Sequence, residues 1–277
     1  MIRKTAFFLS LVLSLAMSFF VIKIRIPNEL YLPLVLWIGF YLGLIALWFI
    51  FTFIFSLFLN KKKEYTTQNR LVDRIISLTM ELLLNLAHVK ILKENIEAVP
   101  KDEKFLLVYN HTSNFDPIII NHVLRKYKII HVSKPENFKI PIAGPFVHRN
   151  CYQAIDRESP MKALKTIDKC IGFINENKFS VGIAPEGTRN KGNDKELLPF
   201  KGGCFHIAKK TNCKIVICAL MNANKIHKNF PFKRTKVKFS IVKVMDCEEY
   251  KDLRTSDISN TARDLIQRKL YEKEETL

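Results

Sequence analysis

Two long stretches without a charged side chain open the sequence, and they restrict its fold more than any other feature. Residues 5–22 form an uncharged run of 18 residues, and residues 30–59 form one of 30. A helix of ~20 residues crosses the ~30 Å hydrocarbon core of a bilayer. Because only residues 23–29 separate the two stretches, we expect a membrane hairpin of two helices, over about 5–22 and 30–59, with both ends on one side.

The first stretch also has the pattern of a secretory signal peptide, which is an alternative to a retained helix. Arg3 and Lys4 precede the apolar run, and Ala16-Met17-Ser18 offers a small-x-small cleavage site. The apolar run continues beyond this site to residue 22, which favours a helix that stays in the protein.

Flanking charges predict the orientation of the hairpin, because Lys and Arg are enriched on the cytoplasmic side of membrane proteins. The link contains Lys23 and Arg25. The basic residues beside the two ends of the hairpin outnumber these, and they are Arg3, Lys4, Lys61, Lys62, Lys63, Arg70 and Arg74. We therefore expect an integral protein of the cell (inner) membrane, with residues 1–60 as the hairpin and residues 61–277 as a cytoplasmic domain.

The net charge of +18 narrows the classes of partner. Residues 1–59 contribute four basic and one acidic side chain, which leaves +15 on the rest of the chain. Such a domain is attracted to anionic head groups, by about 1 kcal/mol for each basic residue near the surface. Nucleic acid is disfavoured, because the basic residues are scattered and no nucleic-acid-binding signature is present. We expect membrane lipids and phosphate-bearing substrates as partners, and no nucleic acid.

Short β-like runs alternate with helical ones along the rest of the chain. This alternation predicts an α/β domain with a central, mostly parallel sheet flanked by helices. The expected strands are 104–109, 128–133, 151–155, 179–184, 214–220 and 235–245, and the expected helices are 66–97, 117–126, 160–176, 203–211 and 256–274. Residues 236–244 alternate basic and apolar side chains, as a half-exposed or edge strand does. In folds of this class, ligands bind beyond the carboxyl ends of the strands.

The loop after the first of these strands holds a histidine and a carboxylate five positions apart, His111 and Asp116. An imidazole held by a carboxylate through one nitrogen is a common general base near neutral pH. Pro117 is typical of a first helical turn, so Asp116 lies at or next to a helix N-cap. This segment by itself equally fits a capping Asp116 beside a surface His111.

Cationic residues follow three other expected strands. Residues 185–190, Pro-Glu-Gly-Thr-Arg-Asn, can present backbone N–H groups, a hydroxyl and the guanidinium of Arg189 to one phosphate. Arg157 and Lys134 each follow another strand. Converging on one site, these residues would bind a phosphomonoester, whereas each of them alone fits an ordinary solvated side chain.

Signatures of several other chemistries are missing from the sequence. The six cysteines form no C-x-x-C pair, and no pair of histidines makes a metal-binding pattern with a carboxylate, so we expect reduced thiols and no metal. Neither G-x-S-x-G nor G-x-x-x-x-G-K-[ST] occurs, so a serine nucleophile and a P-loop have no support.

Four blocks in this order resemble those of the glycerolipid acyltransferases, most closely the bacterial 1-acyl-sn-glycerol-3-phosphate (lysophosphatidic acid) acyltransferases. The blocks are the HxxxxD motif at 110–116, then 133–157, the EGTR block at 185–189, and 215–220, with 200–205 similar to the segment that leads into the last. The likeness spans about residues 100–220, and an N-terminal hairpin is usual in bacterial members. Lys214 and Cys218 stand where prolines are usual, so the last block does not specify the acyl donor.

The resemblance implies transfer of a fatty acyl group from acyl-ACP or acyl-CoA to the free hydroxyl of lysophosphatidic acid, which forms phosphatidic acid without a cofactor. It implies that His111 is the base, that Asp116 orients it, and that Lys134 contacts the phosphate or the developing oxyanion. The residues it assigns to the glycerol-phosphate part of the acceptor are Arg157, Glu186, Gly187, Thr188 and Arg189. An acyl carrier protein is the macromolecular partner that this chemistry implies.

Two alternatives remain compatible with the sequence. The same chemistry can act on glycerol-3-phosphate, another lysophospholipid or an aminoacyl lipid. A non-enzymatic, basic membrane-binding module would explain the charge and the hairpin, but it leaves the ordered motifs as coincidence.

Overall fold

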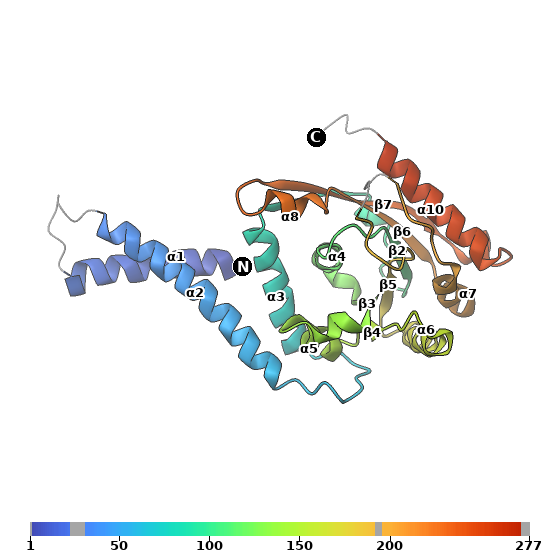
Figure 1. Cartoon of the computed structure of the whole chain (residues 1–277), viewed down its shortest axis with the longest axis horizontal. Helices are drawn as coiled ribbons and strands as arrows, with labels where there is room; N and C mark the ends of the chain where they lie inside the picture. The colour runs from blue at the N-terminus through green and yellow to red at the C-terminus, as the bar shows by residue number, and fades with distance from the viewer. Residues whose placement is uncertain (1, 23–30, 192–195, 273–277) are drawn as a thin grey trace.

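The computed structural model describes residues 2–22, 31–191 and 196–272, and it places two apolar helices beside an α/β domain (Figure 1). Helix α1 (Ile2–Ala16) continues into a π-helical segment, η1 (Met17–Ile22), and α2 spans Leu32–Leu57. Both are long and apolar enough to cross a membrane. The expected link at 23–29 lies outside the described residues. Together α1 and α2 project from one side of the domain (Figure 1), and large apolar side chains along α2 face outward, among them Val35, Leu42 and Ile54.

The base of the hairpin is packed onto the domain. The Trp48 indole N–H donates to Oγ1 of Thr79 at 3.1 Å, which joins α2 to α3 (Arg70–Leu86). The Phe55 ring stacks on Phe146 in α5 (Ala143–Arg149), with the centroids 5.9 Å apart. Such aromatic packing fixes the direction in which the hairpin leaves the domain. The division between the two parts near residue 60 stays a prediction.

A seven-stranded, mostly parallel sheet forms the centre of the domain, which confirms the predicted fold class. Its order is β1-β7-β6-β2-β5-β3-β4, and among these neighbours the β6–β7 pair is antiparallel. The strands are β1 (Val89–Glu94), β2 (Leu106–Tyr109), β3 (Ile129–Ser133), β4 (Gln153–Ala154), β5 (Ser180–Ile183), β6 (Ile215–Met221) and β7 (Thr235–Met245).

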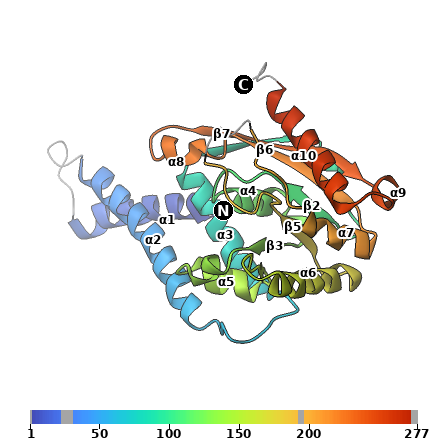
Figure 2. The same ribbon diagram turned by 45° about the vertical axis from the view of Figure 1, so that its right-hand side comes forward.

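Helices cover both faces of this sheet, so the central strand β2 alternates between two apolar cores. Leu106 and Val108 face the core under α6 (Pro160–Asn175), α7 (His206–Thr211) and α10 (Thr255–Tyr271). Leu107 and Tyr109 face the core under α3, α4 (Asp116–Val123) and α8 (Lys225–Asn229). The two helical layers are apparent in Figures 1 and 2. The remaining short helices are η2 (Ile96–Ala98), η3 (Arg125–Tyr127), η4 (Pro135–Lys139), η5 (Gly202–Phe205) and α9 (Cys247–Tyr250).

The expectation of one helix over 66–97 is wrong after residue 86. Helix α3 ends at Leu86, and His88 adopts a left-handed conformation with φ of 51° that turns the chain. Residues 89–94 form β1, which pairs in parallel with β7. Pairing with a strand almost 150 positions later in the chain overrides the local helical pattern. Because β7 pairs with β1 on one side and with β6 on the other, it is an inner strand rather than an edge strand.

Candidate active site

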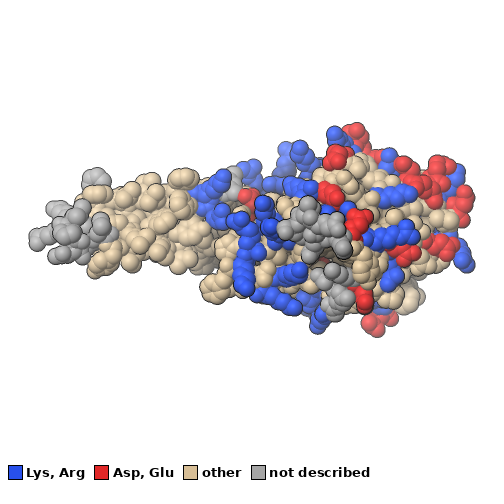
Figure 3. All heavy atoms as spheres, turned by 90° about the horizontal axis from the view of Figure 1, so that it is seen from above, with Lys and Arg blue, Asp and Glu red and all other residues tan. Residues whose placement is uncertain are grey.

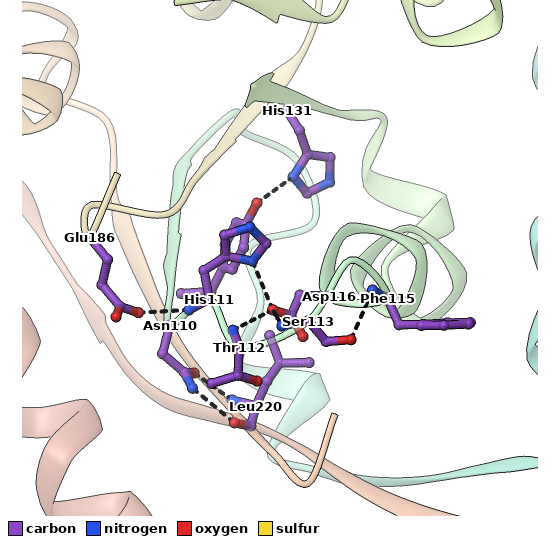
Figure 4. Close-up of polar contacts among 10 residues, drawn as sticks. Asn110, His111, Thr112, Ser113, Phe115, Asp116, His131, Glu186 and Leu220 are labelled. Carbon is purple, nitrogen blue, oxygen red and sulfur yellow. Dashed lines mark hydrogen bonds and ion pairs between the residues drawn. The ribbon is translucent and has the colours of Figure 1, made fainter. Parts of the chain in front are cut away.

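His111 and Asp116 meet in the loop between β2 and α4 (Figure 4). Nδ1 of His111 lies 2.8 Å from Oδ2 of Asp116. The same oxygen accepts the backbone N–H groups of Thr112 and Ser113, each at 2.8 Å. Two N–H donors on one oxygen favour the ionised carboxylate, so Nδ1 carries the proton that faces it. Nε2 of His111 is therefore left with its lone pair and can accept a proton.

The two members of this pair differ in exposure. The Asp116 side chain is fully buried, whereas that of His111 is 23% exposed. Burial of the carboxylate keeps water from competing for Oδ2, and the exposed part of the imidazole remains open to a substrate. Pro117 in the first turn of α4 places Asp116 at the start of that helix, as the sequence predicts.

Glu186, in the loop after β5, holds the backbone of His111. Its Oε1 accepts the His111 N–H at 2.7 Å, and its Oε2 accepts the Leu198 N–H at 3.3 Å. Asn190 donates its own N–H to the His111 carbonyl at 2.8 Å. Burial raises the pKa of Glu186, and the N–H groups of His111 and Leu198 oppose that shift. Hydrogen bonds thus join the HxxxxD and EGTR blocks. The expected role of Glu186 in binding the acceptor stays a prediction.

Asn110 anchors the other side of the loop between β2 and α4, residues 110–115, which is called the catalytic loop here. Its side-chain amide donates to the Leu220 carbonyl at 2.9 Å and accepts the Leu220 N–H at 2.8 Å. This buried pair extends the contact between β2 and β6 beyond the last ladder position of β2. Asn110 has no predicted role, although an asparagine directly after a strand and before a candidate base is a usable signal for such a clamp.

The cations predicted to bind phosphate lie at the same end of the sheet. Gly187 has φ of +73°, a conformation that suits glycine, and it turns the chain between Glu186 and the exposed Thr188. Arg189 is half-buried just beyond. Arg157, after β4, is also half-buried; burial lowers its pKa, whereas the nearby Glu136 and Tyr109 raise it. Tyr109 directly precedes Asn110 and His111, so Arg157 approaches the catalytic loop.

Two lysines differ in their relation to the EGTR block. Lys134 lies exposed between β3 and η4. Lys201 lies against Gly187, because a Cβ built on that glycine would stand 3.4 Å from the Lys201 Nζ. The Lys201 N–H also donates to the Pro185 carbonyl at 3.0 Å. Residues 199–203 contain two adjacent glycines, which mark a turn. The sequence does not indicate that the Lys201 ammonium group reaches the EGTR block.

His131 lies behind the catalytic loop, fully buried in β3. Its Nδ1 is 3.1 Å from the Tyr109 hydroxyl, and its Nε2 has no hydrogen-bond partner among the described residues. Burial, with a smaller contribution from the nearby His111, lowers its pKa to about 3. The ring is therefore neutral, and Gly182 beside it leaves the space that the ring needs, since a Cβ there would stand 2.8 Å from Nδ1.

Comparison with known proteins assigns this arrangement to a family. A family model described as Acyltransferase matches residues 90–221, which contain the HxxxxD and EGTR blocks. The 1-acyl-sn-glycerol-3-phosphate acyltransferase of Haemophilus influenzae is 30% identical over 185 residues, 65% of this chain and 75% of that protein. The enzyme of the same name from Escherichia coli is 26% identical over 168 residues, 60% of this chain and 67% of that protein.

A solved structure shares the fold over the whole chain. The crystal structure of the 1-acyl-sn-glycerophosphate (LPA) acyltransferase PlsC from Thermotoga maritima superposes with a TM-score of 0.60. The alignment covers 99% of each chain at 18% sequence identity. From the identity to the Haemophilus influenzae relative and the family match over the catalytic blocks, this chain belongs to the acyltransferase family.

Proposed function

We propose that this acyltransferase transfers a fatty acyl group from an acyl thioester to the free hydroxyl of lysophosphatidic acid, forming phosphatidic acid. The single observation that carries the proposal is the His111–Asp116 pair, 2.8 Å apart, in a loop tied directly to the EGTR block. The pair supplies a base for a hydroxyl, and the half-buried arginines nearby supply the charge that a phosphomonoester needs. The relatives named for lysophosphatidic acid acylation support this acceptor.

The reaction follows from the tautomer of His111. Nε2 accepts the proton of the acceptor hydroxyl while the hydroxyl oxygen attacks the thioester carbonyl carbon. The carbon–sulfur bond then breaks, an ester forms, and the leaving thiolate takes the proton from the imidazolium. Asp116 keeps the ring oriented and stabilises its positive charge between these two steps. The hydroxyl attacks the donor directly, so no acyl-enzyme is formed.

The phosphate of the acceptor is assigned to the cations beyond β4 and β5. Arg189 and Arg157 offer planar donors for a bidentate grip on phosphate oxygens. Gly187 and Thr188 add a backbone N–H and a hydroxyl, and Glu186 keeps this loop in register with His111. Lys134 is assigned to the phosphate or to the oxyanion that develops on the thioester.

The two apolar helices support a membrane location for this chemistry. We assign the protein to the cell (inner) membrane as an integral protein, with residues 61–277 in the cytoplasm, where acyl-ACP and acyl-CoA are available as donors. The basic residues that flank the hairpin ends support this orientation. The proposed reaction uses no cofactor and no metal.

An acceptor panel tests the proposed function. Purified protein in mixed micelles is given labelled acyl-CoA or acyl-ACP with lysophosphatidic acid, glycerol-3-phosphate, a lysophosphatidylcholine or an aminoacyl lipid. We expect phosphatidic acid as the dominant product, and at least 1000-fold less of it with His111→Ala, on the order of what a general base and its proton transfer contribute. Asp116→Asn keeps the shape of the pair but removes the charge, and it should also lower turnover because the imidazolium loses its stabilisation. Faster turnover with any other acceptor, or near-normal turnover by His111→Ala, would contradict the proposal.

A further inference from the structure

The turn between α8 and β7 displays two phenylalanine rings to solvent. Phe232 is 93% exposed and Phe230 is 54% exposed. Large apolar side chains side by side on a surface mark an interaction site when polar residues rim them. Residues 228–234 are named the Phe loop here, and their sequence is Lys-Asn-Phe-Pro-Phe-Lys-Arg.

The Phe loop has a fixed backbone, so the exposure of its rings is built into the fold. The His88 ring donates through Nδ1 to the Pro231 carbonyl at 2.8 Å. Within the turn, the Lys233 N–H donates to the Asn229 carbonyl at 2.8 Å, and the Asn229 amide donates to the Thr235 hydroxyl at 2.9 Å. These bonds hold the turn in a shape that carries both rings away from the core.

Charge around the Phe loop matches an anionic surface. The exposed basic side chains on and beside it are Lys225, Lys228, Lys233, Arg234 and Lys236. Lys and Arg gather where the apolar hairpin meets the domain, whereas Asp and Glu gather toward the opposite end of the molecule (Figure 3). The Phe loop projects on the same side as α1 and α2 in two views (Figures 1 and 2). A bilayer that receives the hairpin is therefore within reach of the loop.

The Phe loop is also coupled to the catalytic loop. His227, on the helix that leads into it, packs edge-on against Phe115, with the ring centroids 5.4 Å apart. Phe115 directly precedes Asp116, and its N–H donates to the Ser113 hydroxyl at 3.2 Å. Ile226 of the same helix is fully buried in the core beneath α4. The position of the Phe loop thus sets the position of His111 relative to whatever surface the loop contacts.

We infer that the Phe loop is a second membrane-inserting element, separate from the hairpin. Phe230 and Phe232 enter the boundary between head groups and acyl chains, and Lys228, Lys233 and Arg234 bind the phosphates of anionic lipids around them. With the hairpin as one anchor and the loop as another, the domain has a defined tilt on the bilayer. The tilt holds the catalytic loop at a fixed distance from the head groups.

Fluorescence quenching tests the insertion on the full chain. Trp37→Phe and Trp48→Phe remove the native tryptophans, and Phe232→Trp then reports from the loop. The protein is reconstituted in phosphatidylcholine–phosphatidylglycerol vesicles with or without brominated acyl chains. We expect brominated lipid to quench at least half of the Phe232→Trp emission. The matched control is Tyr271→Trp, an exposed position on α10, whose emission should not change.

The alternative binding partner of the Phe loop is a second copy of this chain. In that case Phe232→Trp is unaffected by brominated lipid, and Phe230→Ser with Phe232→Ser converts a dimer to a monomer; either result overturns the inference. The quenching requires no turnover, so an inactive protein that is still quenched separates this inference from the proposed function.

Activity gives a second measurement. Phe230→Ser with Phe232→Ser should lower turnover of vesicle-embedded acceptor at least fivefold, while turnover of a soluble short-chain acceptor stays within twofold. Replacing Lys228, Lys233 and Arg234 by Gln should remove most of the stimulation by phosphatidylglycerol. Equal loss on both acceptors, in a variant whose unfolding temperature is unchanged, would show that the rings act on something other than membrane contact, and would also overturn the inference.

Discussion

The backbone N–H of His111 donates to Oε1 of Glu186 at 2.7 Å, so the candidate base and the EGTR block share a hydrogen bond. The glutamate is almost fully buried, and its other oxygen accepts a second backbone N–H, from Leu198. Because both of its oxygens accept backbone N–H groups, we expect this carboxylate to act mainly by fixing the loop that carries His111. Its effect on catalysis passes through the position of the imidazole.

Replacement of Glu186 should therefore lower kcat more than it raises KM. Glu186→Ala leaves the His111 N–H without its acceptor, at a cost of about 1–3 kcal/mol, and we expect kcat to fall about 10- to 100-fold. Glu186→Gln keeps a carbonyl oxygen for that N–H and should recover part of the loss. Steady-state kinetics with lysophosphatidic acid measure both. A rise in KM with kcat unchanged would instead place Glu186 on the acceptor.

Loss of a cation beside the EGTR block should weaken binding of the phosphorylated acceptor selectively. A hydrogen bond to a charged group contributes about 1.5–3 kcal/mol, so Arg189→Gln should raise KM for lysophosphatidic acid about 10- to 100-fold. Lys201→Gln should act in the same direction, because the Lys201 ammonium lies against Gly187. Monoacylglycerol, which lacks the phosphate, is the control acceptor, and its KM should not change. An equal loss with both acceptors would argue against phosphate binding.

His131 should make the protein less stable in mild acid. Burial lowers its pKa to about 3, well below the 6.5 of an exposed imidazole. Between these values the unfolded chain binds one proton more at this position than the native state does. Stability is therefore lost as the pH falls from 6.5, by up to about 1.4 kcal/mol per pH unit.

Thermal unfolding of the detergent-solubilised protein checks this slope. His131→Asn removes the titrating ring, and its unfolding temperature should fall less steeply than that of the unchanged protein between about pH 7 and pH 5. Parallel slopes for the two proteins would assign the acid sensitivity to other groups.

Most of the candidate catalytic centre could be predicted from the sequence, because its residues lie in local motifs. The five-residue spacing of His111 and Asp116 and the following Pro117 fix a loop and a helix start, and the structure has both. The helical hairpin was readable for a similar reason, since uncharged length is a local property. At the His111–Asp116 loop and in the two apolar helices, the local sequence pattern agrees with the structure.

Contacts between segments far apart in the chain could not be predicted from the sequence. Residues 89–94 come directly after the helical spacing that ends at Leu86, and their strand pairing depends on β7, far along the chain. The Asn110–Leu220 clamp and the approach of Lys201 to Gly187 likewise join residues that the sequence does not relate. Their positions follow from strand order, and strand order is set by how the two helical layers pack.

The pairing of β2 with β5 has a consequence for how such a chain can change over generations. Val108 lies opposite Ile183 in the ladder, and His111 and Glu186 each stand three positions further on (111 − 108 and 186 − 183). An inserted or deleted residue between either strand and its motif would slide one partner past the other and separate the base from its support. These two short connections must therefore be inherited at constant length.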